Sequence, residues 1–119
     1  MEAILIKFIV AGSRNFTEYS QLCEFINLCP WKDKITTIIS GGARGVDYLG
    51  EIYAKDNNLL IERYLADWSK GRGAGYARNI VMADKADGLI AVHINGSRGT
   101  QHMIDIATER GLKLWVLKL

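Results

Sequence analysis

Short apolar segments alternate with amphipathic segments along the whole chain, and this alternation restricts the possible folds more than any other feature. Apolar runs typical of buried strands cover residues 4–11, 35–39, 59–65, 88–92 and 112–117. Helical spacing of apolar residues covers residues 19–28, 46–57, 75–85 and 99–110. Strands that alternate with helices favour a parallel sheet covered on both faces. The predicted fold is α/β, a single small Rossmann-like, doubly wound parallel sheet of about five strands with helices on both faces, over residues 1–119.

The same pattern predicts the positions of individual side chains. The third predicted strand is more polar than the others, so we expect it near an edge of the sheet. On the third predicted helix, Ile80, Val81 and the segment 83–86 are expected to face inward. Trp31 and Trp115 are expected to pack within the domain.

Composition and charge exclude several classes of protein. Hydrophobic residues make up 49% and charged residues 24%, which is typical of a globular domain rather than a disordered chain. The net charge of +2 is too balanced for a bulk nucleic-acid coat or a polybasic membrane binder. No apolar run reaches the ~18 residues of a membrane span, and residues 1–4 show no signal-peptide pattern. We therefore expect no membrane partner.

The cysteines and histidines indicate neither a disulfide framework nor a metal site. Cys23 and Cys29 lie six residues apart in one expected helix, so they face different sides and are expected to be small apolar filler. Two isolated histidines cannot supply a zinc site. We expect no metal, no cofactor and a reducing, cytoplasmic location, which is the host cytoplasm if the protein is phage-encoded.

Glycine and arginine gather in four loops, each of which follows a predicted strand. These loops are residues 12–15, 40–47, 67–75 and 95–100. In a parallel sheet, ligands bind outside the carboxyl ends of the strands, at the point where the strand order reverses. The four loops are therefore expected to meet at one rim of the sheet.

The chemistry of this rim predicts a site for an anion, and more narrowly for a nucleotide. Glycine lets the backbone approach a ligand, helix N-termini attract phosphate, and arginine binds phosphate oxygens. Asp47, Glu51 and Asp67 are acceptors suited to ribose or base, and Trp68 offers a face for stacking. The candidate ligand-binding residues are Gly12, Ser13, Arg14, Gly41, Gly42, Arg44, Gly45, Asp47, Asp67, Trp68, Arg78, Asn79, Gly96, Ser97, Arg98, Gly99 and Thr100.

Each of these residues also has a purely structural interpretation. Tight turns between strands and helices need glycine in any case. Asp47 can compensate the dipole of its helix, and Trp68 can pack at the rim. His102 is expected to be an exposed bystander, and the role of His93, close to the site, is left open.

The motifs of several common nucleotide enzymes are missing. Gly-Ser-Arg follows the first strand instead of G-x-G-x-x-G, and no acidic residue ends the second strand. The chain has no G-x-x-x-x-G-K-[ST] loop and no convincing Ser/His/Asp or Cys/His constellation. Dinucleotide binding of the usual kind and P-loop hydrolysis are therefore not expected.

Three motifs together carry a resemblance to a known family. They are the segments 40–47 (SGGARGVD), 66–68 (ADW) and 73–82 (GAGYARNIVM), and Gly12-Ser13-Arg14 fits the family's opening motif. The chain resembles the YspA-like (cpYpsA-related) branch of the SLOG superfamily over nearly its whole length. This resemblance implies a Rossmann-like nucleotide-binding fold that is often dimeric and occurs in bacteria and phages. A homo-oligomer, dimer or higher, is therefore expected.

A more distant similarity to the LONELY GUY phosphoribohydrolases bears on catalysis. Those enzymes pair an Arg-Lys…Met helix with a P-G-G-x-G-T-x-x-E loop. This chain keeps Arg78 and Met82, and it keeps the Gly-Thr pair at 99–100, but Met103 stands in the place of the glutamate. Since cleavage of an N-glycosidic bond builds oxocarbenium character that a carboxylate stabilises, this replacement favours binding over hydrolysis.

Three functions remain, in this order. The first is binding of a nucleotide or nucleotide-derived signalling molecule, by a sensor or by a sequestering protein (a sponge). The second is a nucleotide N-glycosidase or phosphoribohydrolase, with Asp47, Asp67 and Arg78 as candidate catalytic residues. The third is a nucleic-acid-binding domain, which the acidic side chains at the rim oppose, so nucleic acid is not the expected partner.

Overall fold

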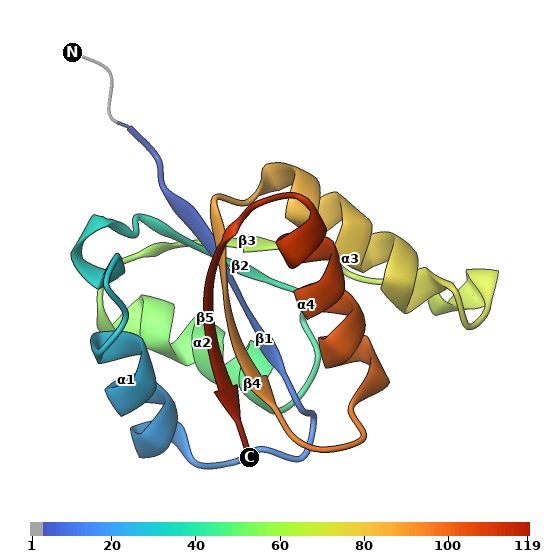
Figure 1. Ribbon diagram of the computed structural model, residues 1–119, viewed down its shortest axis with the longest axis horizontal. Helices are drawn as coiled ribbons and strands as arrows, with labels where there is room; N and C mark the ends of the chain where they lie inside the picture. Colours follow the sequence, from blue (N-terminus) through green and yellow to red (C-terminus); the bar gives the residue numbers. More distant parts are fainter. Residues whose placement is uncertain (1–3) are drawn as a thin grey trace.

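A five-stranded parallel sheet forms the centre of the computed structural model, which describes residues 4–119 (Figure 1). Its strands are β1 (Lys7–Gly12), β2 (Thr37–Ser40), β3 (Leu60–Arg63), β4 (Gly88–His93) and β5 (Lys113–Lys118). They lie in the order β3-β2-β1-β4-β5. The predicted α/β, Rossmann-like fold is confirmed, and the polar third strand is at an edge. Residues 1–3, which belong to the predicted domain and to the signal-peptide prediction, lie outside the described residues.

Four α-helices cover the two faces of the sheet (Figure 1). α1 (Tyr19–Asn27) and α2 (Val46–Asp56) pack on one face, and α3 (Ala74–Lys85) and α4 (Arg98–Glu109) pack on the other. Two short 3₁₀ helices, η1 (Lys32–Lys34) and η2 (Trp68–Lys70), lie in the connections. Within residues 4–119, none of the helices has the length and apolar character needed to cross a membrane.

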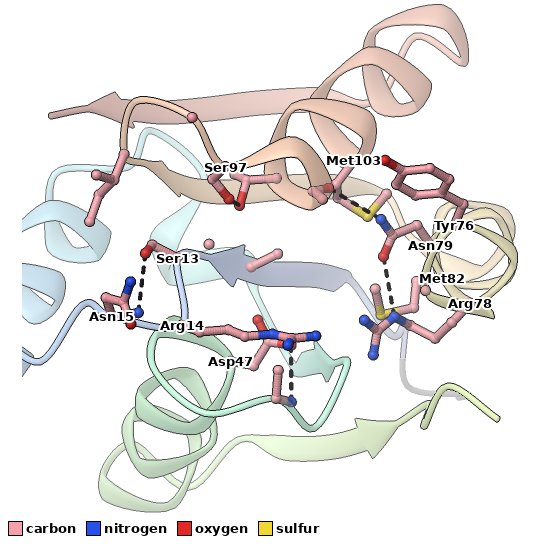
Figure 2. A pocket seen from close by; sticks show the side chains of 18 of the residues that line it. Ser13, Arg14, Asn15, Asp47, Tyr76, Arg78, Asn79, Met82, Ser97 and Met103 are labelled. Carbon is pink, nitrogen blue, oxygen red and sulfur yellow. Dashed lines mark hydrogen bonds between the residues drawn. The ribbon is translucent and has the colours of Figure 1, made fainter. Parts of the chain in front are cut away.

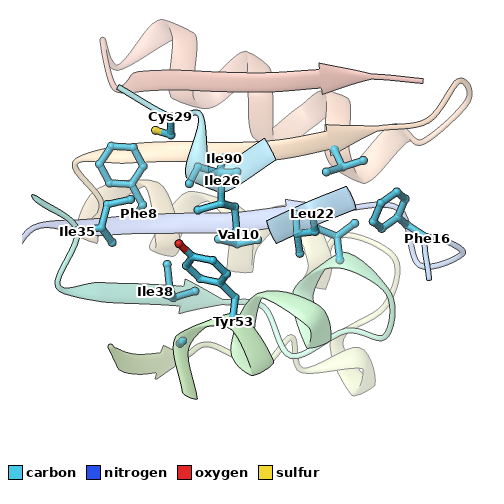
Figure 3. Close-up of a cluster of buried hydrophobic side chains, with 13 residues drawn as sticks. Phe8, Val10, Phe16, Leu22, Ile26, Cys29, Ile35, Ile38, Tyr53 and Ile90 are labelled. Atoms are coloured by element: carbon cyan, nitrogen blue, oxygen red, sulfur yellow. The ribbon is translucent and has the colours of Figure 1, made fainter. Parts of the chain in front are cut away.

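The central strand β1 explains why the first apolar run is nearly continuous. Phe8 and Val10 point into the core beneath α1 and α2 (Figure 3), while Ile9 and Ala11 point into the core beneath α3 and α4. Because successive side chains of a strand alternate between faces, a strand covered on both sides must be apolar throughout. Phe8, Ile9 and Val10 are fully buried as a result.

The inward face of α3 differs from the sequence-based prediction. Ile80 and Val81 were expected inside, but their side chains are 41% and 43% exposed. Asn79 and Met82 are buried instead, while Ala83 is buried as predicted. Positions three and four apart share one side of a helix, and residues 79, 82 and 83 define that side here. The prediction was wrong because the buried amide of Asn79, rather than an apolar residue, begins the inward stripe.

The two cysteines do not share a helix, contrary to the prediction. α1 ends at Asn27, and the backbone N–H of Cys29 bonds to Ile26 O at 3.0 Å in a tighter turn. Pro30 follows, and a proline cannot continue a helix. Both thiols are free.

Trp31 and Trp115 pack within the domain, as predicted. The Trp115 ring stacks on Phe25 with 5.3 Å between ring centroids, and its Nε1–H donates to Phe25 O at 2.8 Å. Trp31 lies against Phe8 with 6.0 Å between centroids.

The loop after β1 and the loop before α2 approach each other closely, and this contact positions the candidate ligand-binding site described below. The backbone N–H of Val46 donates to Ser13 O at 3.2 Å, which ties the start of α2 to the loop after β1. Gly45 adopts φ +78° at this contact, and a Cβ there would lie 2.3 Å from Ser13 O. Glycine is therefore required at position 45 both by its backbone angle and by lack of space.

Replacement of Gly45 is expected to weaken the fold. Gly45→Ala should lower the free energy of unfolding by about 2 kcal/mol or more, because it adds a strained backbone angle to a steric clash. Gly99→Ala is the matched control, since a Cβ on Gly99 would meet no atom within 4 Å and alanine favours helix. Urea unfolding of both variants measures the difference. Equal stabilities would contradict the required role of Gly45.

Candidate ligand-binding site

A pocket of about 460 Å³ opens at the carboxyl ends of β1 and β4 (Figure 2). The chain runs from β1 outward to β3 and then returns to β4 on the other side of β1, so the strand order reverses at this point. Doubly wound sheets bind ligands at such a reversal, because the two neighbouring loops diverge and leave a crevice. We call this cavity the switch-point pocket.

The loop after β1 brings Arg14 into the switch-point pocket. Ser13 Oγ accepts a hydrogen bond from the backbone N–H of Asn15 at 3.1 Å, which shapes the turn around Arg14. The Arg14 guanidinium lies over the Trp68 ring, 5.6 Å from the centroid. Within residues 4–119, Arg14 forms no ion pair with a carboxylate. Its charge is therefore available to a ligand.

The N-terminus of α4 forms the opposite wall. The Ser97 hydroxyl does not cap the helix and instead bonds to the Thr100 hydroxyl at 2.7 Å. The first N–H groups of a helix have no partner within the helix, and here Gly99 and Thr100 line the pocket. A Cβ on Gly96 or Gly99 would meet no atom within 4 Å, so the wall is open to an anion.

Asp47 is a buried carboxyl in the same pocket. Its Oδ2 accepts a hydrogen bond from the backbone N–H of Ala43 at 3.3 Å. Only 5% of the surface of Asp47 is exposed. Burial raises the pKa of Asp47 from 3.8 to about 6, although the backbone N–H groups of Ala43 and Gly12 and the guanidinium groups of Arg78 and Arg14 oppose the shift. This carboxyl therefore exchanges a proton close to neutral pH.

Glu51 does not lie on the rim as predicted. Its Oε2 accepts the Ser40 hydroxyl at 2.6 Å, and it is paired with Arg63. The Arg63 guanidinium holds the pKa of Glu51 below its usual value. Glu51 lies in the second turn of α2, so its side chain points beneath the loop and joins α2 to β2 and β3. Its role is structural.

A chain of hydrogen bonds through Arg78 and Asn79 joins the loop after β2 to the start of α4. Arg78 Nη1 donates to Gly41 O in the loop after β2, and Arg78 Nε donates to Asn79 Oδ1 at 3.2 Å. Asn79 Nδ2 then donates to Gly99 O at 3.3 Å and lies 3.1 Å from His102 Nδ1. Since arginine cannot accept, Asn79 Oδ1 must face Arg78, and His102 Nδ1 must accept from Asn79.

His102 is therefore part of this chain and not an exposed bystander. Its ring is partly buried and lies against Tyr76, with 4.2 Å between the centroids. The prediction was wrong because His102 lies on the side of α4 that contacts α3, and the sequence of α4 alone does not show which side that is.

The structure brings most of the predicted candidates together. Those that line the switch-point pocket are Gly12, Ser13, Arg14, Asp47, Trp68, Arg78, Asn79, Gly96, Ser97, Gly99 and Thr100. A neighbouring cavity of about 450 Å³, which we call the arginine chamber, is lined by Gly41, Gly42 and Arg44 together with Arg14, Ala43, Leu65, Ala66, Trp68 and Arg78.

Three candidates line neither cavity: Gly45, Asp67 and Arg98. The Asp67 carboxylate caps η2, where its Oδ1 accepts hydrogen bonds from the Ser69 hydroxyl at 2.5 Å and from the Ser69 N–H at 3.2 Å. Gly45 serves the contact between the two loops described above. Arg98 is the first residue of α4.

The pocket also contains residues absent from the predicted set. Asn15, Arg72 and Asn95 lie in the loops already singled out, so their positions carried the signal. Tyr76 and Met82 share one side of α3 with Asn79, and the spacing of three residues between 76, 79 and 82 was the available clue. Met103, which stands where the resemblance to the LONELY GUY enzymes leads one to expect a glutamate, lies in the pocket lining with only 1% of its surface exposed.

The described part of the chain offers no cluster of three or more His, Cys, Asp or Glu side chains arranged to hold a metal ion.

The fold and the site define a Rossmann-like protein with a ligand-sized pocket at its switch point. The sequence model of the YspA, cpYpsA-related SLOG family matches residues 6–71, which is more than half of the chain. The protein belongs to this family. No curated protein matches the chain significantly.

Two solved structures share the fold. DNA processing protein A from Helicobacter pylori, described for its single-stranded DNA binding mode, is 24% identical with a TM-score of 0.66. The same protein from Streptococcus pneumoniae is 16% identical with a TM-score of 0.59. The matches cover 93% and 92% of this chain but only 64% and 58% of those proteins. At these identities the likeness shows the fold alone.

The bond between Asn79 and His102 can be tested by Asn79→Asp. A carboxylate at position 79 would face Gly99 O and His102 Nδ1, which are both acceptors, so His102 Nδ1 is expected to take up a proton. ¹⁵N chemical shifts of the imidazole nitrogens at pH 7 report this change. The parent protein should show Nδ1 without a proton. His93, the other histidine, is the internal reference. An unchanged His102 spectrum would contradict the assigned bond.

The burial of Asp47 predicts a dependence of stability on pH. Between pH 4 and 6 the unfolded chain ionises Asp47 while the folded protein keeps it protonated, so stability is lost as the pH rises through this range. Asp47→Asn removes this term. The parent's free energy of unfolding, minus that of the variant, is expected to fall by up to about 3 kcal/mol from pH 4 to 6 in urea unfolding. A constant difference would contradict the buried position of the carboxyl.

Proposed function

We propose that this protein binds a nucleotide or nucleotide-derived signalling molecule in the switch-point pocket. The observation that carries this proposal is the uncapped N-terminus of α4, which lies open at Gly99 on the pocket that Arg14 also lines. Unpaired N–H groups and an unpaired guanidinium both favour a phosphate. The phosphate is expected to lie between them.

The remaining lining suits a nucleoside. Trp68 and Tyr76 offer aromatic surface for a base, and Met82 and Met103 supply an apolar floor. Asp47 supplies an acceptor for ribose hydroxyls or a base amine. Polar groups above an apolar floor are typical of small-molecule sites.

The biological role that we propose is a sensor or a sequestering protein. A chain that binds a signal without converting it either reports the signal to a partner or lowers its concentration. A cytoplasmic location, which rests on the cysteine usage, and a homo-oligomeric state, which rests on the family resemblance, belong to the same proposal. Size-exclusion chromatography with light scattering measures the oligomeric state.

The role of Arg14 can be tested by calorimetry. Arg14→Ala is expected to lower the affinity for a nucleoside 5′-monophosphate by about 10- to 100-fold, because it removes a charge-assisted hydrogen bond worth roughly 1.5–3 kcal/mol. The affinity for the matching nucleoside, which has no phosphate, should fall by less than about 3-fold. Arg98→Ala, which removes an arginine outside both cavities, is the charge-matched control and should lose less than Arg14→Ala. Equal losses for nucleotide and nucleoside would contradict the proposed phosphate position.

Asp47 supports a second candidate function, cleavage of the N-glycosidic bond. A carboxyl with a pKa of about 6 in the pocket is suited to general acid–base catalysis, and Arg78 is close to it. Mass spectrometry of the protein incubated with nucleoside monophosphates separates the two functions. Intact nucleotide supports binding, whereas free base with ribose phosphate, lost in Asp47→Asn, supports the enzyme.

Single-stranded DNA is a third candidate, and the likeness to DNA processing protein A places the expectation against nucleic acid in doubt. The observation that favours DNA is the arginine chamber, which continues the cationic surface beyond the switch-point pocket. Oligonucleotide affinity that falls steeply with salt would support it, since binding then releases counterions.

A further inference from the structure

We infer that the ligand has two nucleoside-like halves joined by phosphates, with one half in the switch-point pocket and the other in the arginine chamber. This inference rests on the proposed function and narrows its ligand class. It starts from the two cavities, which are similar in volume at about 460 and 450 Å³. Each volume alone falls in the range of roughly 300–1,000 Å³ that holds a small ligand.

The boundary between the cavities is cationic. Four residues line both cavities, and they are Arg14, Ala43, Trp68 and Arg78. Two of the four are arginines, whereas each cavity has one further arginine of its own, Arg72 in the switch-point pocket and Arg44 in the chamber, so half of the cationic side chains lie where the cavities meet. A ligand that spans both cavities would place its linking phosphates here, because guanidinium groups bind phosphate oxygens.

Arg14 and Arg78 contribute differently at this boundary. Arg78 Nη1 already donates to Gly41 O, so Arg78 holds the loop that forms the chamber. Arg14 lies against the face of Trp68 and interacts electrostatically with the Asp47 carboxyl, but within the described residues it forms no ion pair. Arg14 is therefore the group that can bind a linking phosphate.

The arginine chamber has the lining that a second base and its phosphate require. Leu65 and Trp68 are large apolar side chains with 69% and 55% of their surface exposed, and both line the chamber. Exposed apolar groups at a cavity are typical of contacts with a flat ligand. Leu65 also lies against the backbone of Gly42, where a Cβ would come within 2.3 Å of Leu65 Cδ2. Arg44 adds a cation to the chamber, as Arg72 does to the switch-point pocket.

Calorimetry with four probes tests this inference. The probes are AMP, diadenosine diphosphate, a thymidine dinucleotide and a ten-residue oligothymidylate. We expect diadenosine diphosphate to bind at least 10-fold more tightly than AMP, because it occupies both cavities. Arg44→Ala, which alters only the arginine chamber, should reduce this ratio to below about 3-fold.

Asn95→Ala is the matched variant for the other cavity, since Asn95 lines only the switch-point pocket. It should weaken AMP and diadenosine diphosphate by the same factor and leave their ratio unchanged.

Each other outcome contradicts a different statement. If AMP binds but diadenosine diphosphate binds no more tightly, the inference fails and the proposed function stands. If the ten-residue oligothymidylate binds more tightly than both the dinucleotide and diadenosine diphosphate, the crevice holds a polynucleotide and the inference fails. If none of the four probes binds, the proposed function fails as well.

Discussion

The site depends on the hydrogen bonds that Arg78 and Asn79 make from adjacent positions of α3. Arg78 holds Gly41 O after β2, and Asn79 holds Gly99 O at the start of α4. These two loops follow β2 and β4, which lie on opposite sides of β1 and do not pair with each other. A partly buried polar network of this kind favours one arrangement, because an unpaired member that is shielded from water would cost the free energy of its lost hydration.

Once the loops are held in place, the chemistry of the site follows from what they leave unpaired. The first N–H groups of α4 and the Arg14 guanidinium are open to an anion, whereas the acidic side chains are mostly occupied. Glu51 is paired with Arg63, and the Asp67 carboxylate caps η2 by accepting the Ser69 N–H. Only Asp47 remains in the pocket, and the nearby guanidinium groups of Arg78 and Arg14 offset its negative charge. The pocket is therefore suited to phosphate in spite of a net charge of only +2.

The sequence predicted the sheet, its helices and the rim, because strand and helix periodicities are local and the carboxyl ends of parallel strands share an edge. It failed where tertiary packing decides. Apolar character alone predicts Ile80 and Val81 on the inward face of α3, whereas that face contains the buried Asn79. His102 and Glu51 were misjudged because their partners, Asn79 and Arg63, are distant in sequence.

A crystal structure with a bound nucleoside 5′-monophosphate tests the central statement most directly. The account predicts that the phosphate lies within hydrogen-bond distance of the Gly99 and Thr100 N–H groups and of the Arg14 guanidinium, with the base toward Trp68 or Tyr76. A nucleotide seated elsewhere on the molecule, with the switch-point pocket filled only by water, would contradict it.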